Sequence, residues 1–256
     1  MAPDCGAAIV AAMDWTDEGV MIGARRLGEA DAVAELFTRD HGRASGFVYG
    51  GASRKKRAAL EPGNRIALEW RARLDEQLGF FSQFESLSAT SARHMDDPAA
   101  LAAIASACDL LRLSTPERAP YPGLYESLLV LLAALDAPAV WPAVYVRWEA
   151  GLLSALGYGL DFSACALTGD RDDLAFVSPK SGRAASRAAG APYADRLLRL
   201  PGFLLAAQNP AVEGDVADGF ALTGAFIERR LLAPAQRDPP EARARLIVAL
   251  GRSGRL

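Results

Sequence analysis

The chain has 256 residues, of which 51% are hydrophobic and 23% are charged, a composition typical of a folded protein and not of a disordered one. Its length predicts one large domain or two small ones. The longest stretch without a charge, residues 200–212, is interrupted by two prolines and a glycine. A membrane-spanning helix needs about twenty apolar residues, so the sequence predicts no membrane span.

The cysteines indicate the redox setting. Cys5, Cys108 and Cys165 stand far apart in the chain with no paired spacing. This pattern argues against a disulfide framework and against a four-cysteine metal site. We therefore expect a reducing, cytoplasmic environment.

The N-terminal segment is expected to lie outside the folded part. An apolar run covers residues 5–13, but no Lys or Arg precedes it, so it lacks the positive region of a secretory signal. We expect residues 1–13 to be a disordered leader or an overhang upstream of the true start. The sequence leaves open whether that start is Met1 or Met13.

Positive charge is concentrated in one segment. Residues 39–73 hold nine Lys or Arg against three acidic residues, a net charge of +6, so the rest of the chain carries −9. Such an asymmetry is typical of a local anion-binding face on an otherwise acidic protein.

The first elements along the chain are expected to be strands. Alternating or β-rich runs occupy residues 20–25, 30–39, 43–50, 66–74 and 78–87. The second and third runs are separated by the short hairpin connection 40–42. Five short strands in about seventy residues favour a small closed barrel, because closure removes free sheet edges. The periodicity leaves both an OB-like and an SH3-like barrel open.

After residue 90 the pattern changes to helices. Helices are predicted at residues 98–113, 122–135, 139–156, 192–207, 215–232 and 239–250. Asp96 and Asp97 precede the first of these and are suited to cap it. The intervening residues 160–191 are rich in Gly, Ser, Asp and Pro and are expected to be irregular. The predicted fold class is α+β, with a five-stranded barrel at 14–90 followed by an all-α domain at 91–256.

Support for catalysis is weak. The histidines are His41, in the hairpin connection, and His94, near the domain boundary. The sequence has neither a G-x-S-x-G serine elbow nor the G-x-x-x-x-G-K-[ST] spacing of a phosphate-binding loop. The adjacent acid pairs at 96–97 and 172–173 point in diverging directions, which does not suit two-carboxylate catalysis. We therefore expect neither enzymatic activity nor a cofactor.

The densest group of positive charge lies between the third and fourth predicted strands and consists of Arg54, Lys55, Lys56 and Arg57. A flexible loop with four cations, backed by Arg71 and Arg73 on one face of the fourth strand, suits a phosphate backbone. The alternative interpretation is a solvated hairpin loop whose charges serve solubility. The sequence leaves both open.

Aromatic residues near these charges are expected to lie in the core and not to stack on bases. They are Phe47, Tyr49 and Trp70. In the helical domain, Tyr145, Trp148 and Leu152 recur on one helix face and are likewise expected in the core. Arg147 lies off that stripe and is a candidate anchor for a partner's carboxylate.

Several segments together resemble the RecO family of bacterial DNA repair and recombination mediators. The segments are Trp15–Val20, Gly28–Asp31, Phe37–Arg43, Gly50–Lys55, Leu60–Gly63, Leu152–Asp161 and Ser178–Arg183. Each fragment is short, but their order and spacing run from about residue 14 to residue 250.

The resemblance implies an N-terminal OB-fold and a helical domain with a zinc-binding insert at the position of residues 160–191. It also implies binding of single- and double-stranded DNA and annealing of complementary strands. Together with RecR, such a protein loads recombinase onto strands coated by single-strand-binding protein. The helical domain would receive the acidic, Phe-ended tail of that protein, for which we place the carboxylate anchor at Arg147. The family's basic OB-fold residues correspond here to Arg39, Arg43, Arg54, Lys55, Lys56 and Arg57.

The chain departs from the zinc-binding pattern of the family. Cys165 is present, Thr168 occupies the next ligand position, and residues 182–189 contain no cysteine. One thiolate without further good ligands does not complete a tetrahedral shell, so we expect no structural zinc.

Two other classes of protein stay open. One is an OB-fold RNA-binding protein, because no residue pattern reports on recognition of the 2′-hydroxyl. The other is a protein-binding adaptor whose barrel charges are incidental.

Overall fold

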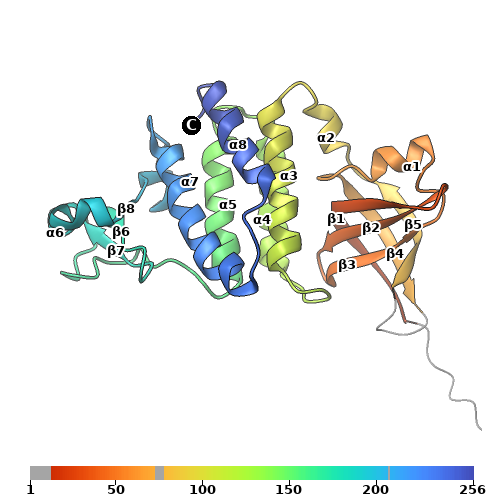
Figure 1. Cartoon of the computed structure of the whole chain (residues 1–256), viewed down its shortest axis with the longest axis horizontal. Coiled ribbons are helices and arrows are strands. Elements are labelled where there is room, and N and C mark those ends of the chain that lie inside the picture. Colours follow the sequence, from red (N-terminus) through yellow and green to blue (C-terminus); the bar gives the residue numbers. More distant parts are fainter. Residues whose placement is uncertain (1–12, 73–77, 207) are drawn as a thin grey trace, which may run out of the picture. The chain divides into compact units, whose positions relative to one another are not determined.

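The computed structural model describes residues 13–72, 78–206 and 208–256 and divides them between two compact units (Figure 1). The first unit ends at Ser91 and also includes Pro116–Pro120; the second comprises Ala92–Thr115 and Tyr121–Leu256. Residues 1–12 of the expected leader and the predicted DNA contact Arg73 lie outside the described residues. The expectation was wrong for Met13, which is the first residue of a strand and pairs with Ala72.

The first unit is a closed five-stranded barrel, as predicted. Its strands are β1 (Met13–Leu27), β2 (Asp31–Thr38), β3 (Gly42–Val48), β4 (Arg65–Ala72) and β5 (Gly79–Ser86). The strands follow one another around the barrel in the order β1-β2-β3-β5-β4, with β3 and β5 parallel and the other pairs antiparallel. This order, with a short helix inserted between β3 and β4, is that of an OB-fold and decides between the two barrels that periodicity left open.

Strand β1 closes the barrel because it is long enough to pair on both sides. Its first part, Met13–Val20, pairs with β4, and its second part, Gly19–Leu27, pairs with β2. A register shift between Met21 and Gly23 bends the strand between these partners. Alternate side chains point inward, and the buried interior includes Met21, Leu36, Ile66, Leu68 and Trp70.

The segment Pro116–Pro120 belongs to the barrel unit although it lies between two helices in the sequence. The Arg118 backbone N–H donates to the Arg43 carbonyl at 2.9 Å, and the Arg118 guanidinium lies 5.4 Å from the Trp70 ring centroid. Gly42 has φ +68°, and a Cβ at this position would lie 2.1 Å from the Ala119 carbonyl oxygen. Only glycine therefore allows this close approach.

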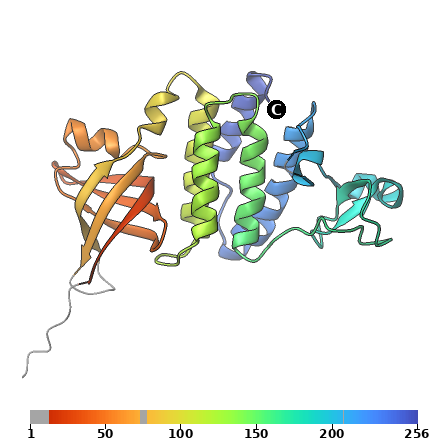
Figure 2. The same ribbon diagram turned by 180° about the vertical axis from the view of Figure 1, so that it is seen from behind.

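The second unit is built from long helices. In the structure, the short helix α2 (Thr90–Arg93) lies at the boundary between the units. It is followed by α3 (Pro98–Ser114), α4 (Pro122–Ala134), α5 (Trp141–Ala155), α7 (Asp215–Phe226) and α8 (Glu241–Arg252). Helix α3 packs on α8, and α5 packs on both α4 and α7. Figure 2 shows α4 and α5 side by side, in green, from behind. No helix in the described ranges is long and apolar enough to cross a membrane.

A buried ion pair joins three of these helices. Glu149 on α5 is fully buried, and its carboxylate accepts hydrogen bonds from Arg243 of α8 at 2.7 and 3.0 Å. The Thr223 hydroxyl of α7 donates to the same carboxylate at 2.5 Å. Breaking a buried pair of this kind leaves an uncompensated charge and costs about 3–5 kcal/mol, so the pair fixes how α5, α7 and α8 meet.

The prediction of a helix at 192–207 was wrong. The chain instead forms the 3-10 helices η1 (Ala191–Arg196) and η2 (Gly202–Leu204), separated by the short strand β8 (Leu198–Arg199). Pro201, which has no backbone N–H, and Gly202 interrupt a helix here. Residue 207 is outside the described part of the chain.

The segment expected to be irregular also contains regular structure. It forms β6 (Leu174–Val177), β7 (Ala184–Ser186) and the short α6 (Arg187–Gly190), and β8 pairs with β6 to complete a three-stranded sheet. The helix predicted at 215–232 is α7, continued by the π-helical turns of η3 (Ile227–Leu232). A further 3-10 turn, η4 (Ala233–Ala235), precedes α8.

Asp97 caps α3, as predicted, and also holds the C-terminal end of the chain. Its Oδ1 accepts the backbone N–H groups of Ala99 and Ala100 at 3.0 and 3.2 Å. The Arg255 guanidinium donates to both carboxylate oxygens, at 2.7 and 2.8 Å. The hydrogen bonds from Arg255, followed by those from the two backbone N–H groups, lower the pKa of Asp97 from 3.8 to about 2 although partial burial opposes the shift.

Replacement Arg255→Ala should lower the free energy of unfolding by about 1 kcal/mol at pH 7, because it removes the largest cause of this pKa shift and solvent screens a pair that is only partly buried. The folded carboxyl binds its proton less readily than the unfolded one. The stabilisation is therefore complete above about pH 4 and is lost as the pH falls through about 2. Urea denaturation between pH 7 and pH 2 measures this difference.

The matched control is Arg245→Ala, because Arg245 and Glu241 form an exposed pair on α8 at 3.3 Å. Its expected cost is below about 0.5 kcal/mol at any pH. A cost for Arg255→Ala that stays constant down to pH 2 would contradict the proposed pairing with Asp97.

Candidate nucleic-acid interface

The four central cations of the basic segment lie on a short helix, α1 (Arg54–Ala59), between β3 and β4 (Figure 1). The expectation of a flexible loop was therefore wrong. The Arg57 N–H donates to the Ser53 carbonyl at 2.8 Å, and the Leu60 N–H donates to the Lys56 carbonyl at 3.0 Å. Ala59 and Leu60 are buried in the barrel core, which fixes the polar face of the helix outward.

The side chains on this outward face are available for a ligand. Arg54, Lys55 and Arg57 are exposed, while Lys56 is half-buried and donates from Nζ to the Tyr49 carbonyl at 2.6 Å. Within the described ranges none of these four cations is paired with a carboxylate. Their charge is therefore not neutralised by the protein, which is the condition for attracting an anion.

Other predicted contacts are paired with acids. Arg43 pairs with Glu35 and, at 3.7 Å, with Glu117. Phe37 lies opposite Arg43 in the β2–β3 register, which places Glu35 diagonally across from it on the same face. Arg71 donates from Nε to Glu69 at 2.9 Å, since residues two apart on β4 share a face.

Arg39 lies half-buried just after β2, and its backbone N–H donates to the Glu18 carbonyl at 3.1 Å. The predicted contacts are thus divided in space, and the cations without a carboxylate partner are those on α1.

Two exposed arginines that were not predicted, Arg25 and Arg26, lie at the end of β1 and line a cavity together with Arg57. The sequence feature that could have pointed to them is that two arginines stand next to each other just before a turn at Gly28.

The aromatic residues near the basic segment differ in burial. Trp70 is 3% exposed and lies in the core, as predicted. Tyr49 is 58% exposed, so the expectation of a core position was wrong for this residue. The reason is the alternation along β3, in which the even-numbered residues from Gly42 to Val48 are buried, so that Tyr49 follows on the outward-facing side. The Tyr49 ring lies 6.0 Å from that of Phe80 and is accessible next to Lys56.

The predicted partner contact Arg147 lies on α5. Its Nε donates to the Phe203 carbonyl at 3.0 Å, and NH2 lies 3.4 Å from the carbonyls of Ala206 and Asn209. The guanidinium also lies 5.6 Å from the centroid of the Phe203 ring. Arg147 therefore holds the segment after β8 against α5.

The hydrophobic stripe of α5 lies in the core, as predicted. Tyr145 and Leu152 are fully buried, and Trp148 is 3% exposed. The Tyr145 hydroxyl donates to Ser106 of α3 at 2.6 Å, which satisfies its polar end inside the core.

The insert does not provide a zinc site. Cys165 is buried, and its sulfur accepts hydrogen bonds from the Thr168 hydroxyl and, next in strength, from the Ser186 backbone N–H, which lower the pKa of the thiol to about 6. Thr168 and Ser186 are poor zinc ligands. No group of three or more His, Cys, Asp or Glu side chains suited to a metal ion occurs in the part of the chain described. Hydrogen bonds to the sulfur and the pairing of β6 with β7 hold the insert.

The strand order and the basic helix define an OB-fold barrel joined to a helical domain, a class in which barrels commonly bind oligonucleotides. Comparison with known proteins identifies the family. The profile described as Recombination protein O N terminal matches residues 13–90, and that described as Recombination protein O C terminal matches residues 95–238. The chain belongs to the RecO family of DNA repair proteins.

Similar relatives are described as DNA repair protein RecO. The relative from Hyphomonas neptunium is 50% identical over 236 residues, which cover 92% of this chain and 97% of that protein. The relative from Rhodospirillum centenum is 49% identical over 237 residues, covering 92% and 94%. That from Phenylobacterium zucineum is 48% identical over 244 residues, covering 95% and 100%.

Elemental analysis of the purified chain should find far less than one zinc per molecule, because the described residues hold no group of three or more His, Cys, Asp or Glu side chains suited to a metal ion. Addition of a zinc chelator should leave the unfolding temperature unchanged. One tightly held zinc per chain, or a chelator-induced loss of stability, would show that the insert keeps a metal site.

Proposed function

We propose that this RecO-family protein is a DNA repair and recombination mediator that binds single- and double-stranded DNA through the face formed by α1. In this proposal it anneals complementary strands in the cytoplasm. It also helps to load recombinase onto DNA coated with single-strand-binding protein. The observation that carries the proposal is the group of four cations on α1 that have no carboxylate partner among the described residues.

The chemistry of α1 suits a nucleic-acid backbone. Each cation that neutralises a phosphate releases a condensed counterion, which favours binding without regard to base sequence. The exposed ring of Tyr49 beside Lys56 offers a surface on which a base can stack. Arg39, Arg43 and Arg71 remain candidate contacts in this proposal, although the last two would first have to leave their carboxylate partners.

The proposed role does not include catalysis of a reaction. His41 stacks on Trp15 with ring centroids 4.0 Å apart, and its Nδ1 lies 2.8 Å from the Asp17 carboxylate. His94 is buried, with Nε2 3.4 Å from Asp136. Both histidines are thus engaged in contacts within their own units, which supports a structural role for each.

The alternatives are an RNA-binding protein and a protein-binding adaptor. Competition between single-stranded DNA and RNA of matched sequence separates the first from the proposed function. An adaptor would bind no polyanion under any salt condition. A gel-shift with and without single-strand-binding protein would test whether coated DNA is also recognised.

The fourfold variant with alanine at residues 54–57 should flatten the salt dependence of single-stranded DNA binding. Each phosphate contact on a single strand contributes about −0.7 to the slope of log K against log salt concentration, so four contacts contribute up to about −2.8. Because not every side chain of a helix reaches a phosphate, we expect a change of about 1.5–2.5. Titration of a fluorescent oligonucleotide at several salt concentrations measures it, and the change should be the same for different base sequences.

The stability of this variant should change by no more than about 0.5 kcal/mol, because the four positions are exposed or half-buried and alanine favours helix. A matched control removes four exposed arginines that also have no carboxylate partner among the described residues, namely Arg171, Arg196, Arg229 and Arg252. An unchanged slope in the folded α1 variant, or an equal change in the control, would place the DNA-binding face elsewhere.

The helical domain is the proposed site for protein partners. The family resemblance implies RecR and the acidic, Phe-ended tail of single-strand-binding protein, and Arg147 is our proposed anchor for the tail's carboxylate. A terminal aromatic ring and a carboxylate need an apolar slot next to a cation. A second surface with this character is the groove of about 900 Å³ between α3 and α8, whose lining includes Leu101, Val248 and Arg252.

Arg147→Ala should weaken binding of the tail peptide and leave binding of naked single-stranded DNA unchanged. Because the guanidinium also holds the backbone of residues 203–209, the unfolding temperature must be measured alongside peptide affinity. The matched variant is Arg252→Ala, whose side chain is exposed at the α3–α8 groove. If only Arg252→Ala lowers the affinity for the peptide, the tail binds in the groove and not at α5.

A further inference from the structure

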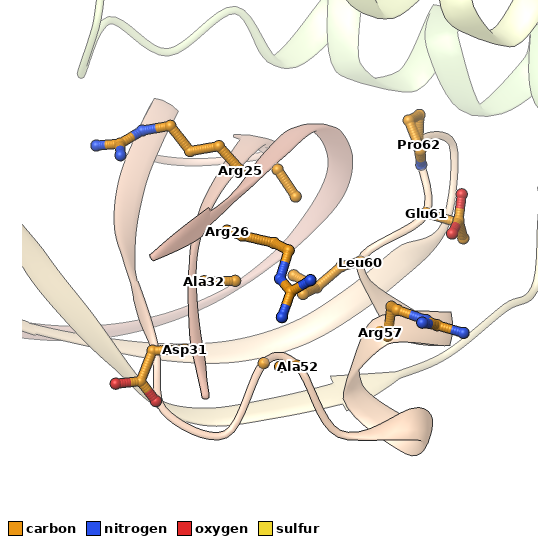
Figure 3. A pocket seen from close by; sticks show the side chains of 11 residues that line it. Arg25, Arg26, Asp31, Ala32, Ala52, Arg57, Leu60, Glu61 and Pro62 are labelled. Atoms are coloured by element: carbon orange, nitrogen blue, oxygen red, sulfur yellow. The ribbon is translucent and has the colours of Figure 1, made fainter. Parts of the chain in front are cut away.

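A cavity of about 330 Å³ opens beside α1 on the barrel surface (Figure 3). Its walls come from the end of β1, the start of β2, the turn before α1 and the residues that follow α1. The cavity volume lies at the lower end of the range of small-molecule sites, about 300–1,000 Å³. It is therefore large enough for a group of nucleotide size.

The cavity combines an apolar wall with positive charge. Ala24, Ala32, Leu60 and Pro62 supply apolar surface, and Arg26 extends across the cavity between them (Figure 3). The Arg26 NH2 lies 3.4 Å from the Glu29 carbonyl, and the side chain has no carboxylate partner among the described residues.

The charged groups differ in direction. The Arg57 side chain points away from Arg26 at one edge of the cavity, and Arg25 turns outward at another (Figure 3). Asp31 accepts the Gly50 N–H at 2.7 Å, so its carboxylate is used in the turn before α1. Glu61 remains at the rim as an exposed carboxylate.

We propose that this cavity binds one nucleotide of the DNA strand, with its phosphate on Arg26 and its base against the apolar wall at Leu60. The proposal rests on the proposed function, because the strand is brought to the cavity by α1, of which Arg57 is a part. A guanidinium binds phosphate oxygens through two parallel hydrogen bonds, which suits Arg26 to this ligand.

Glu61 distinguishes a nucleotide from a bare phosphate. Its carboxylate repels a phosphate at the rim in either ligand, but only the nucleotide offers it the exocyclic amino group of a base such as cytosine, from which it accepts hydrogen bonds. The apolar wall likewise gains nothing from inorganic phosphate, whereas burial of a base removes apolar surface from water. The cavity should therefore prefer a nucleoside monophosphate to phosphate alone.

The test is a titration of the full chain, followed by NMR, with deoxycytidine 5′-monophosphate and separately with inorganic phosphate. The nucleotide should bind at least about tenfold more tightly than phosphate. Arg26→Ala should lower the affinity for the nucleotide by about tenfold, which is the usual effect of losing one charged hydrogen bond. Ala24→Leu, at an exposed strand position that lines the cavity, should lower the affinity for the nucleotide to a similar extent, because the larger side chain fills part of the cavity without a change in charge.

The matched control is Arg25→Ala, which removes the same charge from the neighbouring outward-facing residue and should leave nucleotide affinity within about twofold. Equal affinity for nucleotide and phosphate, or an unchanged affinity in Ala24→Leu, would overturn the proposal.

A fluorescent oligonucleotide titrated in parallel separates this proposal from the proposed function. The oligonucleotide can bind with its full salt dependence while the cavity variants leave the affinity for the mononucleotide unchanged. In that case only the cavity proposal fails. If wild-type protein does not bind the oligonucleotide, the proposed function fails, and the cavity proposal fails with it.

Discussion

Closure of the barrel by β1 is the constraint on which the proposed interface depends. Because Met13–Val20 pairs with β4 and Gly19–Leu27 pairs with β2, each strand of the barrel has a neighbour on both sides. Among the described strands little sheet edge is left for a ligand to extend, which favours recognition by side chains and by the connections between strands. The connection between β3 and β4 holds α1 against the barrel through Ala59 and Leu60, so closure also fixes where the four cations point.

Ion pairing decides which of the basic residues can act on a ligand. Arg43 and Arg71 are balanced by acids on the same barrel face, at distances set by strand register and by the two-residue period of a strand. The cations of α1 follow Ser53 on a short helix whose first turn contains no acidic residue. The positive charge of the segment is thus most accessible on α1, next to Arg26 and the exposed ring of Tyr49.

The features that depend on residues close together in the sequence were predicted correctly. Alternation of apolar and polar residues predicted the five strands, and Asp97 before a proline-initiated helix predicted a cap that the structure confirms. Signals that depend on tertiary contacts were not predictable. The pairing of Arg43 with Glu35 requires the strand register, and the exposure of Tyr49 depends on which alternate positions of β3 face the core. Residues 54–59 are too few for helical periodicity, so α1 was expected to be a loop.

Lysine footprinting tests the central claim, that α1 binds DNA, most directly. The lysines of the chain are Lys55 and Lys56 on α1 and Lys180 in the helical unit, where its exposed side chain provides an internal reference. Acetylation rates measured by mass spectrometry, with and without single-stranded DNA, should fall at Lys55 and Lys56 and stay constant at Lys180. Equal rates at Lys55 and Lys56 in the presence and absence of saturating DNA would contradict the account.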